Sequence, residues 1–349
     1  MNRADPMSTD HPLRRLTVLG WLIGLVVGVL AAWVAVSAAG GLAEARDALS
    51  QVDLRWLIPA VAFEAGSYFV LGSKIRHLVG PDVLSSRQAL GVGLILSGFG
   101  PLAPAAPAGG IALSASYLNH RGVPGRRIAL ILALAEWTSV LVFLLISAVN
   151  VIVVVSIERG AFADFWPLVV ISVVILIFLA FLAWLATRSS ALERVGAWLG
   201  LLRRSKHRRP VEERRAAAAR WQREAREFLG HPRRGITIGV LTAIAFLGDV
   251  ACLWCALRGA GADVGFHIAL LGISVASVSV LVPFVPGGLG IVEAAIPAVV
   301  HRFAIPYDLG LAAVVAYRAI SLFLPAGVGS IVVLVMRRSV RTNATEGAG

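Results

Sequence analysis

Ionisable side chains interrupt the long apolar stretches of this sequence at Glu64, Glu136, Asp249, Glu293 and Arg318. A charge at the centre of a bilayer costs roughly 2.5–3.5 kcal/mol on insertion scales, so such residues normally face a polar interior. Arg318 keeps its charge and presents a planar fork of donors that suits phosphate or carboxylate. Four acids against one arginine leave negative charges that must be protonated, hydrated or paired with a substrate cation. We therefore expect proton or cation coupling at Glu64, Glu136 and Asp249, with a structural ion-pair network as the alternative.

Two further apolar stretches are broken by proline and glycine. Residues 88–120 contain Gly98-Phe99-Gly100-Pro101 and the run from Pro104 to Gly110, and residues 264–302 contain Pro286-Gly287-Gly288-Leu289-Gly290. Helices that begin near Gly110 and Leu289 would present free N–H groups and roughly half a positive charge, which favours an anion. We predict an anion site, such as one for a lipid phosphate, from Gly109, Gly110, Pro286, Gly287, Gly288, Gly290, Glu293 and Arg318. Two alternatives are that the glycines only allow close packing and that Glu293 only caps its helix.

The composition places the chain in a membrane. Of its 349 residues, 58% are hydrophobic and 15% are charged, and the mean hydropathy is +0.81. A soluble core cannot bury such an excess, because an average soluble domain is about 25% charged. The net charge of +12 could suggest nucleic acid, but the basic residues fall between apolar runs, which is typical of a membrane protein. We expect no enzymatic activity, no cofactor, no metal and no nucleic-acid partner.

Apolar runs long enough to span a bilayer, about 20 residues each, can be counted along the chain. They cover residues 16–39, 54–73, 128–157, 165–187, 235–257 and 307–336. The loop at 188–234 carries 14 Lys/Arg and five acids, so the positive-inside rule favours a cytoplasmic location. With a cytoplasmic N-terminus, this location requires residues 88–120 to enter and return on the cytoplasmic side as a re-entrant hairpin. The same test, with Arg337, Arg338 and Arg341 inside, favours a second hairpin at 264–302 that enters from the outer face. We expect a plasma-membrane domain over residues 16–336, with cytoplasmic tails at 1–15 and 337–349.

The predicted elements repeat. A span, a broken hairpin and a second span occur in residues 54–157 and again in 235–336, and Gly122-Val123-Pro124 corresponds to Ala304-Ile305-Pro306. An odd number of spans separates the two units, so they would be inverted, as in many transporters. Glu136 and Arg318 occupy related places and could pair across the pseudo-axis. The predicted fold is all-α and polytopic, with about six spanning helices, two re-entrant helical hairpins and inverted repeats.

Several other patterns carry less weight. Gly20, Gly24 and Gly28 recur every four residues, which permits close helix packing within the chain or in a homodimer. Cys252 and Cys255 have CxxC spacing, but they lie in an apolar span without a second ligand pair, so we interpret them as small buried side chains. The basic 188–234 loop could bind anionic headgroups or a partner, or simply set orientation.

The run from Pro286 to Glu293, followed by Tyr317-Arg318, resembles the membrane domain of lysylphosphatidylglycerol synthase/flippase proteins. The resemblance covers most of residues 54–336. It implies lipid translocation between leaflets, with Glu293 and Arg318 at polar positions of that family. Synthase activity is not expected, because the chain stops 13 residues after its last predicted span.

These observations favour a flippase that moves a phospholipid or a lipid-linked headgroup, with membrane lipids as its partners. A proton-coupled transporter of a small soluble solute is one alternative. Another is a non-transporting membrane partner of a cell-envelope glycosyltransferase.

Overall fold

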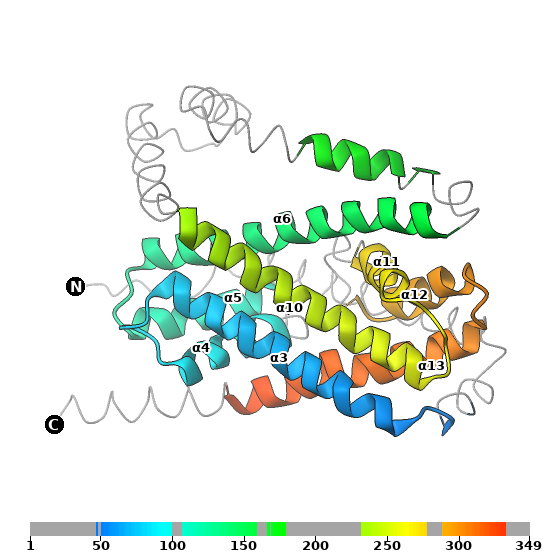
Figure 1. The fold of residues 1–349 in the computed structure, drawn as a ribbon. Coiled ribbons are helices and arrows are strands. Elements are labelled where there is room, and N and C mark those ends of the chain that lie inside the picture. Colours follow the sequence, from blue (N-terminus) through cyan, green and yellow to red (C-terminus); the bar gives the residue numbers. More distant parts are fainter. Residues whose placement is uncertain are drawn as a thin grey trace, which may run out of the picture. The chain divides into compact units, whose positions relative to one another are not determined.

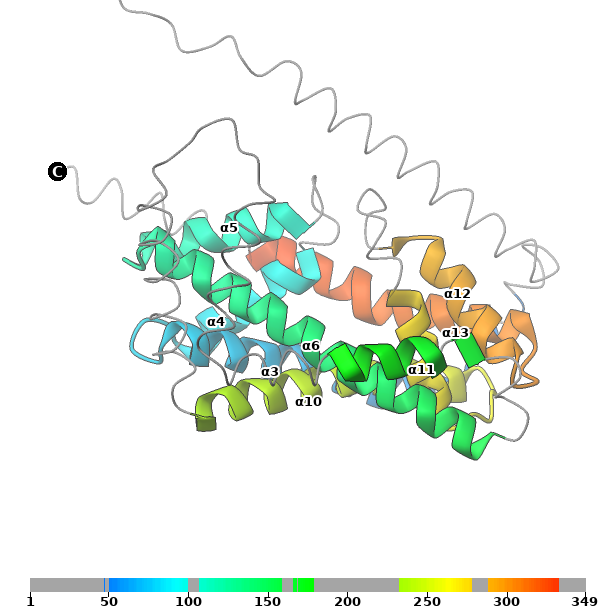
Figure 2. The ribbon, with the colours of Figure 1, turned by 90° about the horizontal axis from the view of Figure 1, so that it is seen from above.

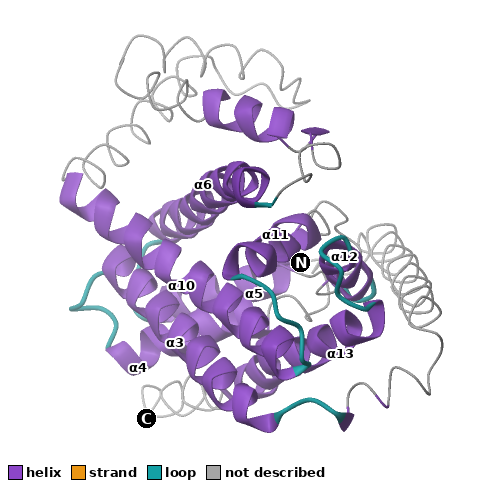
Figure 3. Ribbon diagram, turned by 45° about the vertical axis from the view of Figure 1, so that its right-hand side comes forward, coloured by secondary structure: helices purple, strands orange, loops and turns teal. Residues whose placement is uncertain are grey.

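The computed structural model describes residues 47, 50–99, 107–158, 166, 167, 169–178, 232–277 and 288–332. Within these ranges the regular elements are helices, without a strand (Figure 3). In chain order they are α3 Leu54–Val79, α4 Ser86–Gly93, the π-helix η1 Leu94–Phe99, α5 Pro107–His120, α6 Gly125–Ile157, α10 Pro232–Gly259, α11 Phe266–Ala276, α12 Ile291–His301, α13 Tyr307–Arg318 and the π-helix η5 Ala319–Phe323 (Figure 1). A further apolar helix covers Val169–Phe178.

Four described helices are long and apolar enough to cross a membrane: Leu54–Val79, Gly125–Ile157, Arg233–Gly259 and Tyr307–Val332. The shortest have 26 residues, so they reach about 39 Å at 1.5 Å per residue, more than the roughly 30 Å of hydrocarbon. They confirm four of the predicted spans and the all-α, polytopic membrane fold. Val169–Phe178 falls within the span expected at 165–187. The span expected at 16–39, with Gly20, Gly24 and Gly28, lies outside the described residues.

The chain forms two compact units. One unit comprises Met1–Leu132 and Ile244–Gly349, and the other comprises Ala133–Ala243. The second unit contains most of α6, where large apolar side chains such as Leu145 and Val149 are exposed. Exposed apolar side chains suit a lipid-facing helix, because lipid tails are as apolar as leucine. The first unit contains α3, α4, α5, α11, α12 and α13, together with Ile244–Gly259 of α10 and Gly125–Leu132 of α6.

Helices α3 and α10 lie side by side and run in opposite directions (Figure 1). Asp53, which caps the start of α3, donates its backbone N–H to the Gly259 carbonyl at the end of α10, with an N···O distance of 2.8 Å. Farther along, Gly248 faces the Phe63 carbonyl and the Ser67 side chain. A Cβ at Gly248 would clash with the Ser67 hydroxyl, so the glycine permits this close approach.

Helix α13 runs in the same direction as α3. The Tyr68 hydroxyl contacts the Ser321 carbonyl, with an O···O distance of 3.3 Å, and Tyr317 reaches Asp249 on α10. Because α10 is antiparallel to α3, the start of α3, the end of α10 and the start of α13 share one end of this unit. The stretch from α11 to α12 therefore leaves and rejoins the long helices at that end.

The stretch from α4 to α5 leaves and rejoins at the opposite end of α3. Helix α4 is held at its start by a capping box of Ser85 and Gln88, and it packs back along α3, where Gly72 meets Leu90. After α5, Arg127 in the first turns of α6 donates from Nη2 to the Val79 carbonyl at the end of α3, at 3.1 Å. The chain thus returns to the end of α3 from which it departed.

The two returning turns share an unusual backbone geometry. Gly122 and Ala304 both have positive φ, at 79° and 61°, and each precedes a proline by two residues before the next long helix begins. Within the described part of the chain, Ala304 is the one non-glycine residue with positive φ. The left-handed conformation is strained for alanine, so the shared turn supports the predicted correspondence of Gly122-Val123-Pro124 with Ala304-Ile305-Pro306.

Candidate functional site

The start of helix α12 is capped by the carboxylate of Glu293, a residue of its own first turn. Gly290, which precedes the helix, has a φ of 82° that suits glycine, and its N–H donates to Glu293 Oε2 with an N···O distance of 2.6 Å. Glutamate three residues into a helix is a recognised capping arrangement, and its charge favours the positive end of the helix dipole. Glu293 thus makes the capping contact that the sequence left as the alternative, and its part in an anion site stays a prediction.

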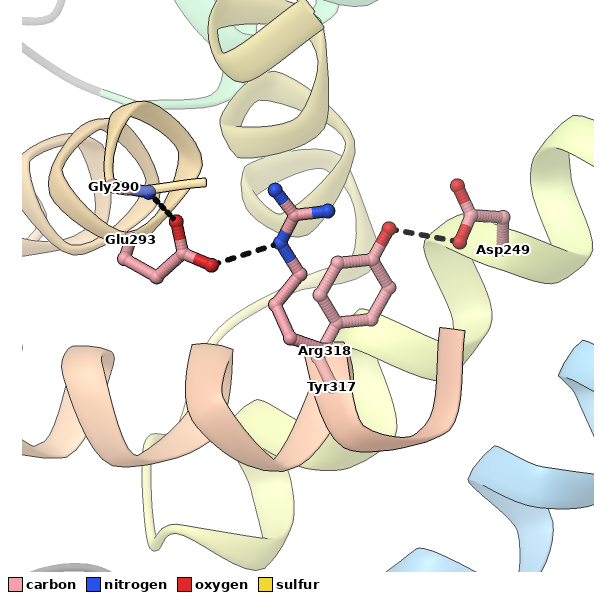
Figure 4. Close-up of polar contacts among 5 residues, drawn as sticks. All are labelled: Asp249, Gly290, Glu293, Tyr317 and Arg318. Carbon is pink, nitrogen blue, oxygen red and sulfur yellow. Dashed lines mark hydrogen bonds and ion pairs between the residues drawn. The ribbon is translucent and has the colours of Figure 1, made fainter. Parts of the chain in front are cut away.

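Glu293 also pairs with Arg318 on the neighbouring helix. Arg318 is the last residue of α13, and its Nε donates to Glu293 Oε1 at 3.1 Å (Figure 4). The two side chains are only 10% and 15% exposed. Helices α12 and α13 approach closely because Gly310 faces Pro297 and Val300, and α11 packs on α12 beside them (Figure 2). A largely buried ion pair is thus held between two tightly packed helices.

Tyr317, the residue before Arg318, points to a different helix. Its hydroxyl donates to Asp249 Oδ1 on α10, with an O···O distance of 2.8 Å (Figure 4). Adjacent residues of α13 therefore contact α12 on one side and α10 on the other. The adjoining backbone continues as the π-helix η5, and π-segments frequently occur at functional sites.

Glu64 on α3 completes the polar group. Its carboxyl lies close enough to that of Asp249 for a hydrogen bond, and the residue is 5% exposed. Glu64 Oε2 is buried and has no hydrogen-bond donor among the described residues. Two carboxyl groups thus meet beside the close contact of Gly248 with Ser67 and the Phe63 carbonyl.

These side chains lie near the middle of the candidate spans. Glu64 is the eleventh of 26 residues in its candidate span, Arg318 is the twelfth of 26, and Asp249 is the seventeenth of 27. Helix α12 has 11 residues, or about 16 Å, which is roughly half of the hydrocarbon thickness. The start of α12, where Glu293 contacts Arg318, therefore lies near mid-depth of the spans.

The structure brings together part of the predicted site. Gly288, Gly290, Glu293 and Arg318 adjoin at the start of α12, and Glu64 and Asp249 adjoin each other on α3 and α10. Arg318 pairs with Glu293, whereas Glu136 is exposed on the part of α6 that belongs to the second unit. The pair between Glu136 and Arg318 stays a prediction.

Other predicted residues are placed only in part. Gly109 and Gly110 lie in the first turn of α5, which begins at Pro107, and Gly110 is buried. Pro286 and Gly287 lie outside the described residues, as does loop 188–234 up to residue 231. Among the described residues no group of three His, Cys, Asp or Glu side chains is arranged to hold a metal. Cys252 and Cys255 are buried free thiols.

Two tyrosines adjoin the site without having been predicted as site residues, although Tyr317 is part of the Tyr317-Arg318 motif. Tyr68 and Tyr317 face the carboxyl pair from α3 and α13. Both could have been suspected from the sequence, because Tyr317 is next to Arg318 and Tyr68 is one helical turn after Glu64. A buried tyrosine hydroxyl usually finds a hydrogen-bond partner.

The fold and the site together define a multi-pass α-helical membrane protein with a charged site near the middle of its spans. Residues 21–329 match the family model described as lysylphosphatidylglycerol synthase TM region. The chain therefore belongs to that family, as the resemblance of the run from Pro286 to Glu293 implied. No curated protein matches the sequence.

Proposed function

We propose that this protein moves an anionic phospholipid or lipid-linked headgroup between leaflets, and that Arg318 binds the anion. The observation that carries this proposal is the ion pair of Arg318 and Glu293 at mid-depth of the spans. A guanidinium binds carboxylate and phosphate with the same geometry. The family supports a role in lipid modification or transport.

In this proposal, Glu293 occupies the place of the substrate anion. Its two oxygens accept from the two groups that would receive a phosphate, the Gly290 N–H and the Arg318 guanidinium. A headgroup phosphate that reaches mid-depth would displace the carboxylate and take up the same donors. Exchange of one anion for another keeps Arg318 paired throughout, so no step leaves an unpaired buried cation, which would cost several kcal/mol.

The route to the site would run along the two broken stretches. Support comes from the return of 88–120 and of 264–302 to opposite ends of α3. Two re-entrant hairpins entering from opposite faces would give the site access to one leaflet at a time, as in transporters with inverted repeats. The basic residues between spans favour a plasma-membrane location with cytoplasmic termini.

The test is leaflet exchange in proteoliposomes. A fluorescent phosphatidylglycerol is the anionic probe, a fluorescent phosphatidylcholine is the zwitterionic probe, and bleaching by an impermeant reductant reports the outer leaflet. The protein should accelerate exchange of the anionic probe above protein-free vesicles. Arg318→Gln should abolish the acceleration, and Arg318→Lys should retain part of it, because lysine keeps the charge but loses the planar fork.

Other outcomes distinguish the alternatives. Uptake of a water-soluble anionic tracer without lipid exchange would contradict the lipid substrate and favour a solute transporter. Unchanged exchange in Arg318→Gln, with normal insertion, would contradict the role of Arg318. Absence of any flux with well-folded protein would favour a non-transporting partner of a cell-envelope enzyme.

A further inference from the structure

The carboxyl groups of Glu64 and Asp249 have unequal surroundings. Asp249 accepts a hydrogen bond from the Tyr317 hydroxyl and faces the Arg318 guanidinium. Glu64 Oε2 is buried and has no donor in the described part of the chain. Tyr317 and Arg318 therefore compensate a negative charge on Asp249, whereas no described donor compensates one on Glu64 Oε2.

The remaining neighbours of Glu64 do not compensate it. Tyr68 on α3 faces both carboxyl groups, but its hydroxyl contacts the Ser321 carbonyl. Cys252 on α10 also faces the pair and is a buried thiol. Tyr317, from α13, donates to Asp249. Arg318 is the one cation among the described groups that face the carboxyl pair, and it already forms an ion pair with Glu293.

Two adjacent carboxylates cannot both remain ionised in an apolar interior. A hydrogen bond between two carboxyl groups also requires that one of them carries a proton. We propose that Glu64 is an intramembrane proton-binding site, in which Glu64 holds the proton and Asp249 holds the negative charge. A proton is favoured over a metal ion because the carboxyl groups are within hydrogen-bond reach of each other and the described residues offer no three-ligand group.

The site would be linked to the anion site through two adjacent residues of α13. Tyr317 contacts Asp249 while Arg318 contacts Glu293. If a lipid phosphate binds Arg318 in place of Glu293, a step that rests on the proposed function, the region gains a negative charge and the carboxyl pair binds its proton more tightly. Linkage is reciprocal, so protonation of the pair would also strengthen anion binding.

The proton site is tested without any transport assay. Infrared difference spectra of the full chain in lipid nanodiscs, recorded across a pH titration, should show the carbonyl band of a protonated carboxyl group at neutral pH. Glu64→Gln should remove this band, and Glu64→Asp should shift it. Asp249→Leu should retain it, because leucine supplies no hydrogen-bond donor and Glu64 stays buried. Asp308→Asn, which changes an acid in the first turn of α13 away from the site, should leave the spectrum unchanged.

Absence of the band in wild type, or its persistence in folded Glu64→Gln protein, would overturn the proton site. Coupling is tested separately with a pH indicator in weakly buffered nanodisc samples. At the pH where the infrared titration shows Glu64 partly deprotonated, addition of short-chain phosphatidylglycerol should cause proton uptake in wild type and none in Glu64→Gln. Proton uptake that fails while the infrared band is present would overturn the coupling alone. Leaflet exchange that fails while the band is present would overturn the proposed function and leave the proton site standing.

Discussion

Arg318 on α13 and Glu293 on α12 form a largely buried ion pair, in which Nε donates to Oε1 at 3.1 Å. The same carboxylate caps α12 through the Gly290 N–H. One side chain thus stabilises a helix start and neutralises a cation at mid-depth. A substrate anion that uses this arginine must therefore compete with a group already present in the protein.

Removal of one partner of the pair should destabilise the fold more than removal of both. Arg318→Gln leaves a buried carboxylate without its cation and should lower the free energy of unfolding by about 3 kcal/mol. Glu293→Gln combined with Arg318→Gln should recover most of that loss, since no charge is left unpaired. Thermal unfolding of the wild type and the variants in nanodiscs measures these differences in stability. A double variant as unstable as Arg318→Gln would show that the pair is not the source of the loss.

Neutralisation of Glu293 should tighten binding of an anionic lipid. In Glu293→Gln, Arg318 has lost its internal carboxylate, so an added phosphate meets less competition. A charge-assisted hydrogen bond contributes roughly 1.5–3 kcal/mol, so we expect affinity for short-chain phosphatidylglycerol to rise about tenfold or more. Titration monitored by native mass spectrometry gives the affinity. Asp308→Asn is the control and should leave it unchanged; equal affinity in Glu293→Gln would contradict the competition.

Two glycines of the last long helix should respond differently to the same substitution. A Cβ at Gly310 would lie 2.9 Å from Val300 Cγ2 and 3.1 Å from Pro297 Cα, whereas Gly327 has nothing within 4 Å. Gly310→Ala should separate α12 from α13 and cost about 1–3 kcal/mol of unfolding free energy. Gly327→Ala should be close to neutral. Equal unfolding temperatures for the two variants would mean that the α12–α13 contact tolerates the added methyl group.

The return of each broken stretch to its own end of α3 predicts the outcome of cysteine labelling. Single cysteines replace the exposed residues Asp82, Arg121, Asp263 and Arg302 in a background with Cys252 and Cys255 changed to alanine. An impermeant thiol reagent should label positions 82 and 121 from one side and positions 263 and 302 from the other. Labelling of 82 and 121 from different sides would exclude the first re-entrant hairpin.

Local features of the structure were predictable from the sequence. Length and hydropathy indicate the spans, although α3 continues beyond the predicted end at residue 73 to Val79, because Lys74 and Arg76 extend the helix past the apolar run. The cap at Glu293 was also predictable, since glutamate lies three residues after the Gly290 break.

Contacts between distant residues were not predictable in the same way. Glu64 and Asp249 meet only because Gly248 lets α10 approach Ser67 on α3, and no spacing rule relates residues on different helices. The π-helices η1 and η5 have no distinctive sequence pattern, since they depend on packing around the helix. The sequence suggested Glu136 as a partner of Arg318, and the contact of Arg318 with Glu293 became visible only once α12 and α13 were placed.

A density map of the protein in nanodiscs made with phosphatidylglycerol would show directly whether Arg318 binds a lipid phosphate. We expect a headgroup phosphate within hydrogen-bond distance of Arg318 at the start of α12, with the Glu293 carboxylate moved away from the guanidinium. Lipids bound only along the outer faces of the spans, with Arg318 still paired to Glu293 at every lipid concentration, would contradict it.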